Sequence, residues 1–102
     1  MAAIKEELSY VYNIDDSGEE LVRRLDRELD GTIMPLLKKL NMLDKSQDQL
    51  FLCCCLLDLP SDVVAARLGI TPNNVRVKKH RLKELISKLD DPEYDALFDI
   101  RR

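Results

Sequence analysis

Six side chains between Asn73 and Arg81 are of types that recognise the edges of DNA bases. Amide and guanidinium groups form hydrogen bonds with base edges in the major groove, and an apolar group can contact a thymine methyl group. Successive residues on a helix point 100° apart. A helix that buries Val75 therefore exposes amide, guanidinium and apolar side chains on its opposite side, together with Glu84. We expect the base-reading residues to be Asn73, Asn74, Arg76, Val77, His80 and Arg81.

Basic side chains and a helix cap in the same part of the chain suit contact with the DNA backbone. Lysine and arginine on the flanks of an inserted helix meet the phosphates, which fix its position without reading the sequence. A helix N-terminus can also hold a phosphate. The expected phosphate contacts are Arg67, Thr71, Lys78, Lys79 and Lys83.

Charge is segregated along the sequence. The formal net charge is −3, yet residues 60–89 contain seven basic and two acidic side chains. This segment therefore carries +5, against −5 for residues 1–59 and −3 for residues 90–102. A basic segment between acidic ones indicates a surface for a polyanion more clearly than the overall charge does. The plainer interpretation is a basic helix face that only meets solvent.

No group of residues suggests catalysis or a metal site. The three cysteines are consecutive, Cys53 to Cys55, and neighbours on a helix point to different faces. They are therefore badly placed to bridge one another or to converge on a metal, and we expect small buried hydrophobic residues. His80, the only histidine, lies too far along the chain for a zinc spacing. We expect no enzyme, no catalytic residue, no metal and no cofactor.

Residues Leu59 to Leu82 predict a short helix, a tight turn and a second helix. Gly69 suits a left-handed C-cap of the first helix, Thr71 suits the N-cap of the second, and Pro72 suits its first position. Ala65 is small where the two helices would cross. This is the helix-turn-helix pattern. We expect an inner core of Val64, Leu68, Ile70 and Val75, continued along the second helix by Leu82, Leu85, Ile86 and Leu89.

Helical periodicity also covers the residues before this unit. The first dozen residues could form a short helix, and Asp15-Asp16-Ser17 offer N-caps for a second one. An apolar stripe follows from Leu21 to Leu40, which Asp30-Gly31-Thr32 and Pro35 split or kink. The stripe could belong to the core of the chain or to the seam of a dimer.

Two further helices complete the expected fold. Ser46 and Gln49 predict a capping box at the start of a helix through Leu57, whose apolar second half needs burial on more than one side. Asp91-Pro92-Glu93 predicts a final short helix, with Tyr94, Leu97 and Phe98 on its apolar side.

The fold class expected from these elements is all-α, a small helical bundle that contains a helix-turn-helix. We expect one domain over residues 1–102. It would comprise N-terminal helices at 1–44 for core packing or dimerisation, the helix-turn-helix unit at 46–89, and a C-terminal helix or tail at 90–102.

The residues from Leu68 to Arg81 resemble two bacterial families. Leu68-Gly69-Ile70-Thr71, Asn74-Val75-Arg76-Val77-Lys78 and His80-Arg81 are similar to region 4 of sigma factors and, nearly as much, to LuxR-type regulators. The resemblance covers about residues 46–86. Both families usually cap the first motif helix with Ser or Thr and continue with Glu-Ile-Ala, where this chain has Pro60-Ser61-Asp62 and Val63-Val64-Ala65.

Two functions stay open at this point. The first is a sequence-specific transcriptional regulator that binds double-stranded DNA, with two half-sites if the protein forms a homodimer. The second is an interaction module, similar to sigma region 4, that docks on RNA polymerase or another regulator. No apolar run approaches the ~20 residues of a membrane helix, and the N-terminus lacks a signal-peptide pattern. We expect no membrane partner and a cytoplasmic location at the bacterial nucleoid.

Overall fold

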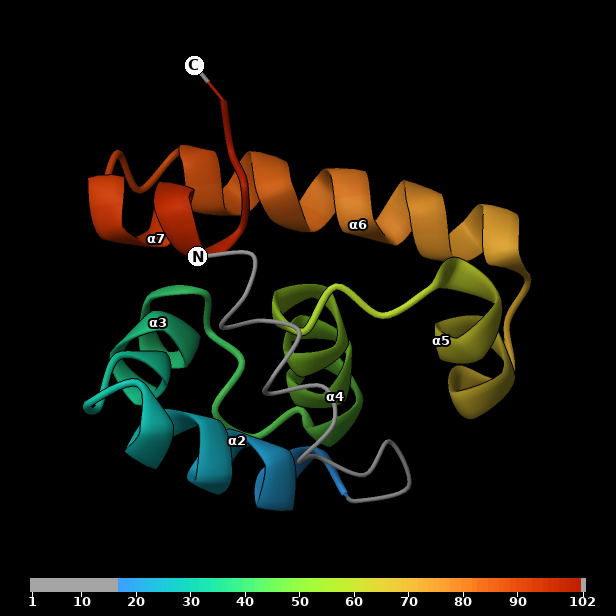
Figure 1. Ribbon diagram of the computed structural model, residues 1–102, viewed down its shortest axis with the longest axis horizontal. Coiled ribbons are helices and arrows are strands. Elements are labelled where there is room, and N and C mark those ends of the chain that lie inside the picture. Colours follow the sequence, from blue (N-terminus) through green and yellow to red (C-terminus); the bar gives the residue numbers. More distant parts are fainter. Residues whose placement is uncertain (1–16, 102) are drawn as a thin grey trace.

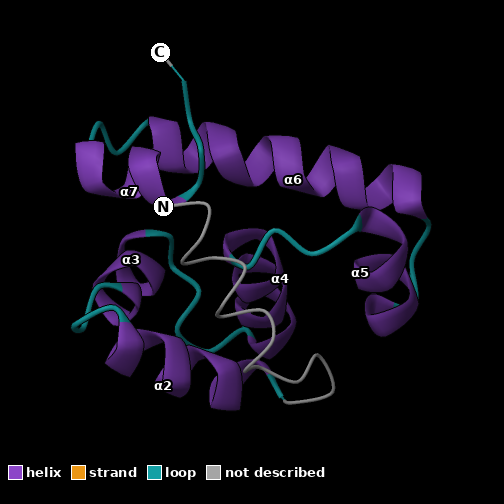
Figure 2. Ribbon diagram, in the orientation of Figure 1, coloured by secondary structure: helices purple, strands orange, loops and turns teal. Residues whose placement is uncertain are grey.

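The computed structural model describes residues 17–101 of the chain (Figure 1). The short helix expected in the first dozen residues lies outside this range. Within residues 17–101 there are helices and no strand (Figure 2), which confirms the all-α prediction. The helices are α2 (Gly18–Glu28), α3 (Ile33–Lys39), α4 (Ser46–Leu56), α5 (Ser61–Leu68), α6 (Pro72–Ser87) and α7 (Pro92–Leu97).

Helix α4 lies in the middle of the bundle and the other helices surround it (Figure 1). Helix α2 packs along α4, α5 packs on α6, and α7 folds back onto the end of α6. The long helix α6 runs along one side of the bundle, and α2 lies on the opposite side (Figure 1). One cluster of buried apolar side chains extends from Leu21 in α2 to Phe98 after α7. The N-terminal helices therefore share their core with the residues around α6.

The middle of α4 is buried in every direction, as its apolar sequence predicts. Leu52 and Cys53 are fully buried, and Cys54 is 1% exposed. Cys55 is half-buried. Consecutive residues on a helix point about 100° apart, so this burial requires neighbours on several sides of α4. The cysteines form part of the core.

The capping box predicted at the start of α4 is wrong. Ser46 is the first residue of α4, and its N-cap is Lys45, whose side chain makes no capping hydrogen bond. Gln49 is buried, and its Nε2 donates to the carbonyl oxygens of Met42 (3.0 Å) and Leu43 (2.8 Å). The carboxamide therefore forms hydrogen bonds with the backbone of the turn after α3 and does not cap its own helix. Helix α4 ends at Leu56, one residue earlier than expected.

Helix α2 begins as the sequence predicts. Ser17 is its N-cap, and the Ser17 hydroxyl accepts a hydrogen bond from the backbone N–H of Glu20 at 3.2 Å. Gly18, the next residue, lies directly against the start of α4. A Cβ atom on Gly18 would stand 2.9 Å from the backbone nitrogen of Leu50, so only glycine allows this approach.

The apolar stripe of α2 and α3 is divided at Asp30 and Gly31, which have φ of 54° and 75°. Pro35 does not interrupt α3 because it is the third residue, where the N–H group would have no intrahelical partner. The stripe is buried within the chain itself, as its interpretation as core predicts. Its fully or nearly fully buried members are Leu21, Val22, Leu25, Ile33, Leu36 and Leu37.

Helix α3 receives its N-terminal cap from α2. The Asp26 carboxylate accepts hydrogen bonds from the backbone N–H groups of Ile33 (2.9 Å) and Met34 (2.8 Å). These two N–H groups belong to the first turn of α3, which has no intrahelical acceptor for them. A side chain seven residues upstream thus fixes the angle between the two helices.

Most helices end on an Asp or Asn residue in the left-handed conformation. After four of these five residues the next backbone N–H bonds back into the last turn, as Met42 does to Leu37 (2.9 Å) and Leu59 to Cys54 (3.2 Å). This is the Schellman arrangement, and at the ends of α3, α4 and α7 the residue that follows is apolar and packs against the core. The left-handed residues at these helix ends are Asp30, Asn41, Asp58, Asp90 and Asp99.

The last helix, α7, is fastened to the turn between α2 and α3. As the sequence predicts, Asp91 caps α7 through a 3.0 Å hydrogen bond from the N–H of Glu93. The Tyr94 hydroxyl donates to the carbonyl oxygen of Thr32 at 3.4 Å. The ammonium of Lys39 lies 5.4 Å from the centre of the Tyr94 ring, within range of a cation–π contact. The C-terminal part of the chain is therefore integrated into the bundle.

Candidate DNA-binding site

Helices α5 and α6 and the turn between them form the predicted helix-turn-helix. Helix α5 ends at Gly69, whose φ of 69° is the left-handed conformation expected of a C-cap. The Thr71 hydroxyl accepts a hydrogen bond from the backbone N–H of Asn74 at 3.1 Å, and Pro72 is the first residue of α6. These local signals fix where one helix stops and the next begins.

A small core holds α5 and α6 at their crossing. Val64, Ala65 and Val75 are 3–4% exposed. Leu68 and Ile70 are half-buried and pack against the same core. These are the five residues that the sequence assigned to this position. Because α5 and α6 share this core, the outer face of α6 keeps a fixed orientation.

The outer face of α6 carries the side chains expected to read bases. Val75, Leu82 and Ile86 bury its inner face. Val77 is 41% exposed and leaves an apolar group on a polar surface, where a thymine methyl could pack. All six expected base-reading residues are exposed: Asn73, Asn74, Arg76, Val77, His80 and Arg81.

These residues do not all point the same way around α6. Arg81 lies on the flank nearest α4, where it lines a groove of about 130 Å³ with Asp48 and Phe51. Arg76 and His80 lie within about 40° of each other on α6, and they point about 140° and 100° away from Arg81. The structure brings the six residues onto one exposed surface, with Arg81 at its edge.

Two of the lysines expected on phosphates have partners inside the molecule. The Lys78 ammonium lies 5.4 Å from the centre of the Phe51 ring. The Lys79 ammonium lies 3.5 Å from a carboxylate oxygen of Asp58, and its side chain is 33% exposed. Neither pairing could be predicted from local spacing, since Phe51 and Asp58 lie more than twenty residues away along the chain.

The other residues expected on phosphates differ in exposure. Arg67 and Lys83 are half-buried, and Thr71 is exposed. The Arg67 guanidinium lies close enough to Cys54 to oppose part of the rise that burial causes in the pKa of that thiol. The Thr71 oxygen is engaged as the cap of α6. Lys83 differs from these residues because it lines a hollow beside α6.

One inward prediction for α6 is wrong. Leu85 is 44% exposed, whereas Leu82 and Ile86 on either side of it are buried. At 100° per residue Leu85 lies about 80° from the direction of Val75, so a small shift in the centre of the buried face exposes it. Leu89, also expected inward, is half-buried.

An acidic residue lies on the same surface as the expected base-reading residues. Oε1 of Glu84 is 2.7 Å from Nε2 of His80, one helical turn away, and both side chains are more than half exposed. The carboxylate repels phosphates, so its place on this surface lowers the affinity for any DNA.

The buried cysteine thiols stay protonated at neutral pH. Burial raises the pKa of Cys53 to about 12, and its cysteine neighbours add to the effect. Burial likewise raises the pKa of Cys54 to about 11, although the Arg67 guanidinium opposes it. The thiolate is the reactive and metal-binding form, so these residues act as core. Residues 17–101 hold no group of three or more His, Cys, Asp or Glu residues that could bind a metal.

This geometry defines the class of the protein as a helix-turn-helix protein with an exposed, polar second helix. The chain belongs to the family described as sigma-70, region 4, whose family model matches residues 33–86. The match confirms the first of the two resemblances and extends it upstream by α3. The likeness to LuxR-type regulators remains a prediction. No curated protein and no solved structure matches the chain. None of the helices within residues 17–101 is long and apolar enough to span a membrane.

Proposed function

We propose that this protein is a sequence-specific transcriptional regulator that inserts α6 into the major groove of double-stranded DNA. The observation that carries the proposal is the exposed outer face of α6, where amides, guanidinium groups and Val77 stand together on a helix held by its inner core. Membership of the sigma-70 region 4 family supports DNA binding by this helix-turn-helix.

The length of the reading surface suits a groove. A helix rises 1.5 Å per residue, so Asn73 and Arg81 lie about 12 Å apart along α6. The major groove of B-DNA is about 12 Å wide. All the base-reading candidates therefore fit within one groove when the first half of α6 enters it. The second half, from Leu82 onward, then reaches the edge of the groove and the phosphates.

A dimer is part of this proposal. One small unit with few phosphate contacts gives modest affinity, whereas two units on one duplex read two half-sites about 34 Å apart. A two-fold repeat in the preferred DNA site would support it. Sedimentation of the free protein at micromolar concentration tests the dimer separately. We place the protein in the cytoplasm, at the bacterial nucleoid, because its target would lie there.

A second function is favoured by the charges around α6. Lys78 and Lys79 have partners within the molecule, and Glu84 adds a negative charge to the outer face. These features suit an interaction module that docks on RNA polymerase or another regulator. This function predicts weak DNA binding and no loss on neutralising the arginines of α6.

Arginine substitutions distinguish the two functions. Arg76→Ala and Arg81→Ala should each weaken binding to the preferred site by about 1–3 kcal/mol and relax the choice of base at one position. Arg27→Ala is the matched control, because Arg27 is also exposed but lies on α2, across the bundle from α6 (Figure 1). If both α6 variants bind DNA like the control, the interaction module is the better account.

A further inference from the structure

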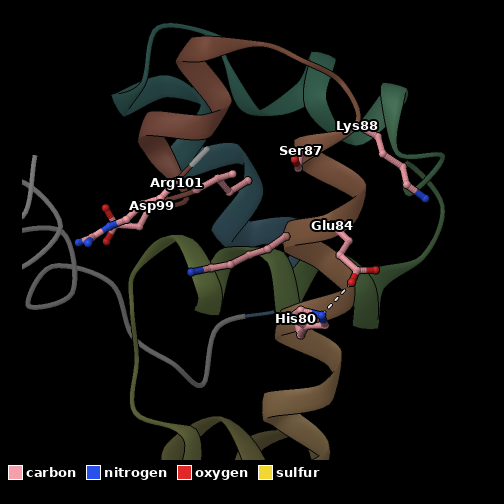
Figure 3. A pocket seen from close by; sticks show the side chains of 8 residues that line it. His80, Glu84, Ser87, Lys88, Asp99 and Arg101 are labelled. Carbon is pink, nitrogen blue, oxygen red and sulfur yellow. Dashed lines mark ion pairs between the residues drawn. The ribbon is translucent and has the colours of Figure 1, made fainter.

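A hollow lies beside the second half of α6, at the edge of the expected base-reading surface, which it meets at His80. It measures about 430 Å³ and is formed by α6 residues from His80 to Lys88 together with residues 99–101. Figure 3 shows the tail residues Asp99 and Arg101 on one side of α6, across from His80 and Ser87. Residues 87–101 follow the stretch that matches the family model, so one wall of this hollow is an addition to the matched unit.

A hydrogen-bonded turn holds the C-terminal tail, residues 99–101, at this position. Asp99 has a φ of 55°, and the backbone N–H of Ile100 donates to the carbonyl oxygen of Asp95 at 2.8 Å. Phe98, immediately before this turn, is 2% exposed, and Ile100 packs against the core. The chain therefore leaves α7 in a fixed direction, and the segment after α7 passes α6 (Figure 1), where Arg101 lines the hollow together with α6 residues.

The cations of the hollow are better placed for an external partner than its carboxylates are. Lys83 and Arg101 both line it, and neither forms an ion pair within residues 17–101. Of the two acidic residues, Glu84 is paired with His80, and Asp99 makes an interaction of its own. Lys88 extends to the other side of α6 (Figure 3). The hollow thus presents an ammonium and a guanidinium from two different elements.

We propose that Lys83 and Arg101 together hold a phosphate of the DNA strand that borders the groove entered by α6. This proposal rests on the proposed function. With the first half of α6 in the major groove, the second half reaches the groove edge, where the backbone passes. A guanidinium can bind two phosphate oxygens at once, and an ammonium adds a point charge beside it. The C-terminal tail then sets how far α6 slides along the groove.

Salt-dependent binding tests this role. Binding of a 20-base-pair duplex of mixed sequence would be measured by fluorescence anisotropy over a series of salt concentrations. Lys83→Ala and Arg101→Ala should each lower the affinity about threefold to tenfold and reduce the slope of log K against log salt by about 0.9, the value for one phosphate. Arg101→Lys should keep the slope. Arg27→Ala, which removes the same charge from α2, should change neither.

The outcomes separate this inference from the proposed function. If Lys83→Ala and Arg101→Ala keep the affinity and slope of Arg27→Ala while Arg76→Ala weakens binding to the preferred site, α6 reads DNA without the tail and the inference is overturned. If the unmodified protein does not bind the duplex at 50 mM salt, the proposed function fails and the inference fails with it. Arg101 is exposed, so its variants are expected to fold normally, which circular dichroism would verify.

Discussion

Nε2 of His80 lies 2.7 Å from Oε1 of Glu84 on the outer face of α6, the surface that carries the expected base-reading residues. An acidic group at this place weakens association with any phosphate backbone, whatever the base sequence. Under the proposed function, the Glu84 carboxylate lowers the affinity for DNA of any sequence.

We predict that Glu84→Gln strengthens binding to mixed-sequence DNA about twofold to fivefold at low salt, because one repulsive charge is removed. The difference should shrink as salt is added. Glu28→Gln, at the exposed end of α2, serves as the control for net charge and should leave the affinity unchanged. Weaker binding by Glu84→Gln would mean that the carboxylate itself contacts a base.

The cap of α6 offers a test of stability. Thr71→Ala removes the hydroxyl that accepts the Asn74 N–H, and should lower the free energy of unfolding by about 1 kcal/mol. Thr71→Ser keeps an acceptor and should lose much less. Urea unfolding followed by circular dichroism gives both values. Equal losses in the two variants would show that the threonine methyl group, and not the hydrogen bond, stabilises the turn.

Asn41 occupies a left-handed conformation at the end of α3, with φ of 58°. Asn41→Gly should stabilise the protein by about 0.5–1 kcal/mol, because glycine adopts this conformation without the steric cost of a Cβ atom. Asn41→Ala should destabilise it. A stability order in which alanine equals or exceeds glycine would contradict the observed backbone conformation.

The cysteines should resist modification in the folded protein. Burial raises the pKa of Cys53 to about 12 and that of Cys54 to about 11, above the ordinary value of 9.0. At pH 8 a thiol reagent should therefore label them only slowly until urea unfolds the chain. Rapid labelling of the native protein would show that α4 is accessible.

The same pKa shifts predict that the free energy of unfolding falls at high pH. A raised pKa means that the folded state holds the thiol protons more tightly than the unfolded state does. This contribution is complete below about pH 9, where the unfolded thiols are also protonated, and is lost as the pH rises toward 11–12. Unfolding midpoints in urea should therefore fall above pH 9. A variant with Cys53→Ala should show a smaller fall.

Local signals predicted the helix-turn-helix well. Gly69, Thr71 and Pro72 act on the backbone within a few residues, so their positions alone placed the turn and the start of α6. The buried stripe of α2 and α3 followed from helical periodicity, which depends only on spacing. The break at Asp30 and Gly31 was visible for the same reason.

Tertiary partners could not be predicted in this way. Gln49 has the right spacing for a capping box, but its carboxamide binds two carbonyl oxygens that only the folded turn after α3 brings near. The helical spacing of Leu85 from Val75 predicts a buried side chain. The centre of the buried face, however, depends on which elements pack against α6. The left-handed Asp and Asn residues carried a signal that was missed, since each follows the last turn of a helix and several precede an apolar residue.

The most direct test of the account is selection of DNA by the purified protein from a random-duplex library, read at two salt concentrations. Base reading by α6 predicts one recurring motif that survives the higher salt, with two-fold symmetry if the protein dimerises, and loss of that motif with Arg76→Ala. Binding without a motif that disappears at the higher salt would contradict sequence-specific recognition by α6.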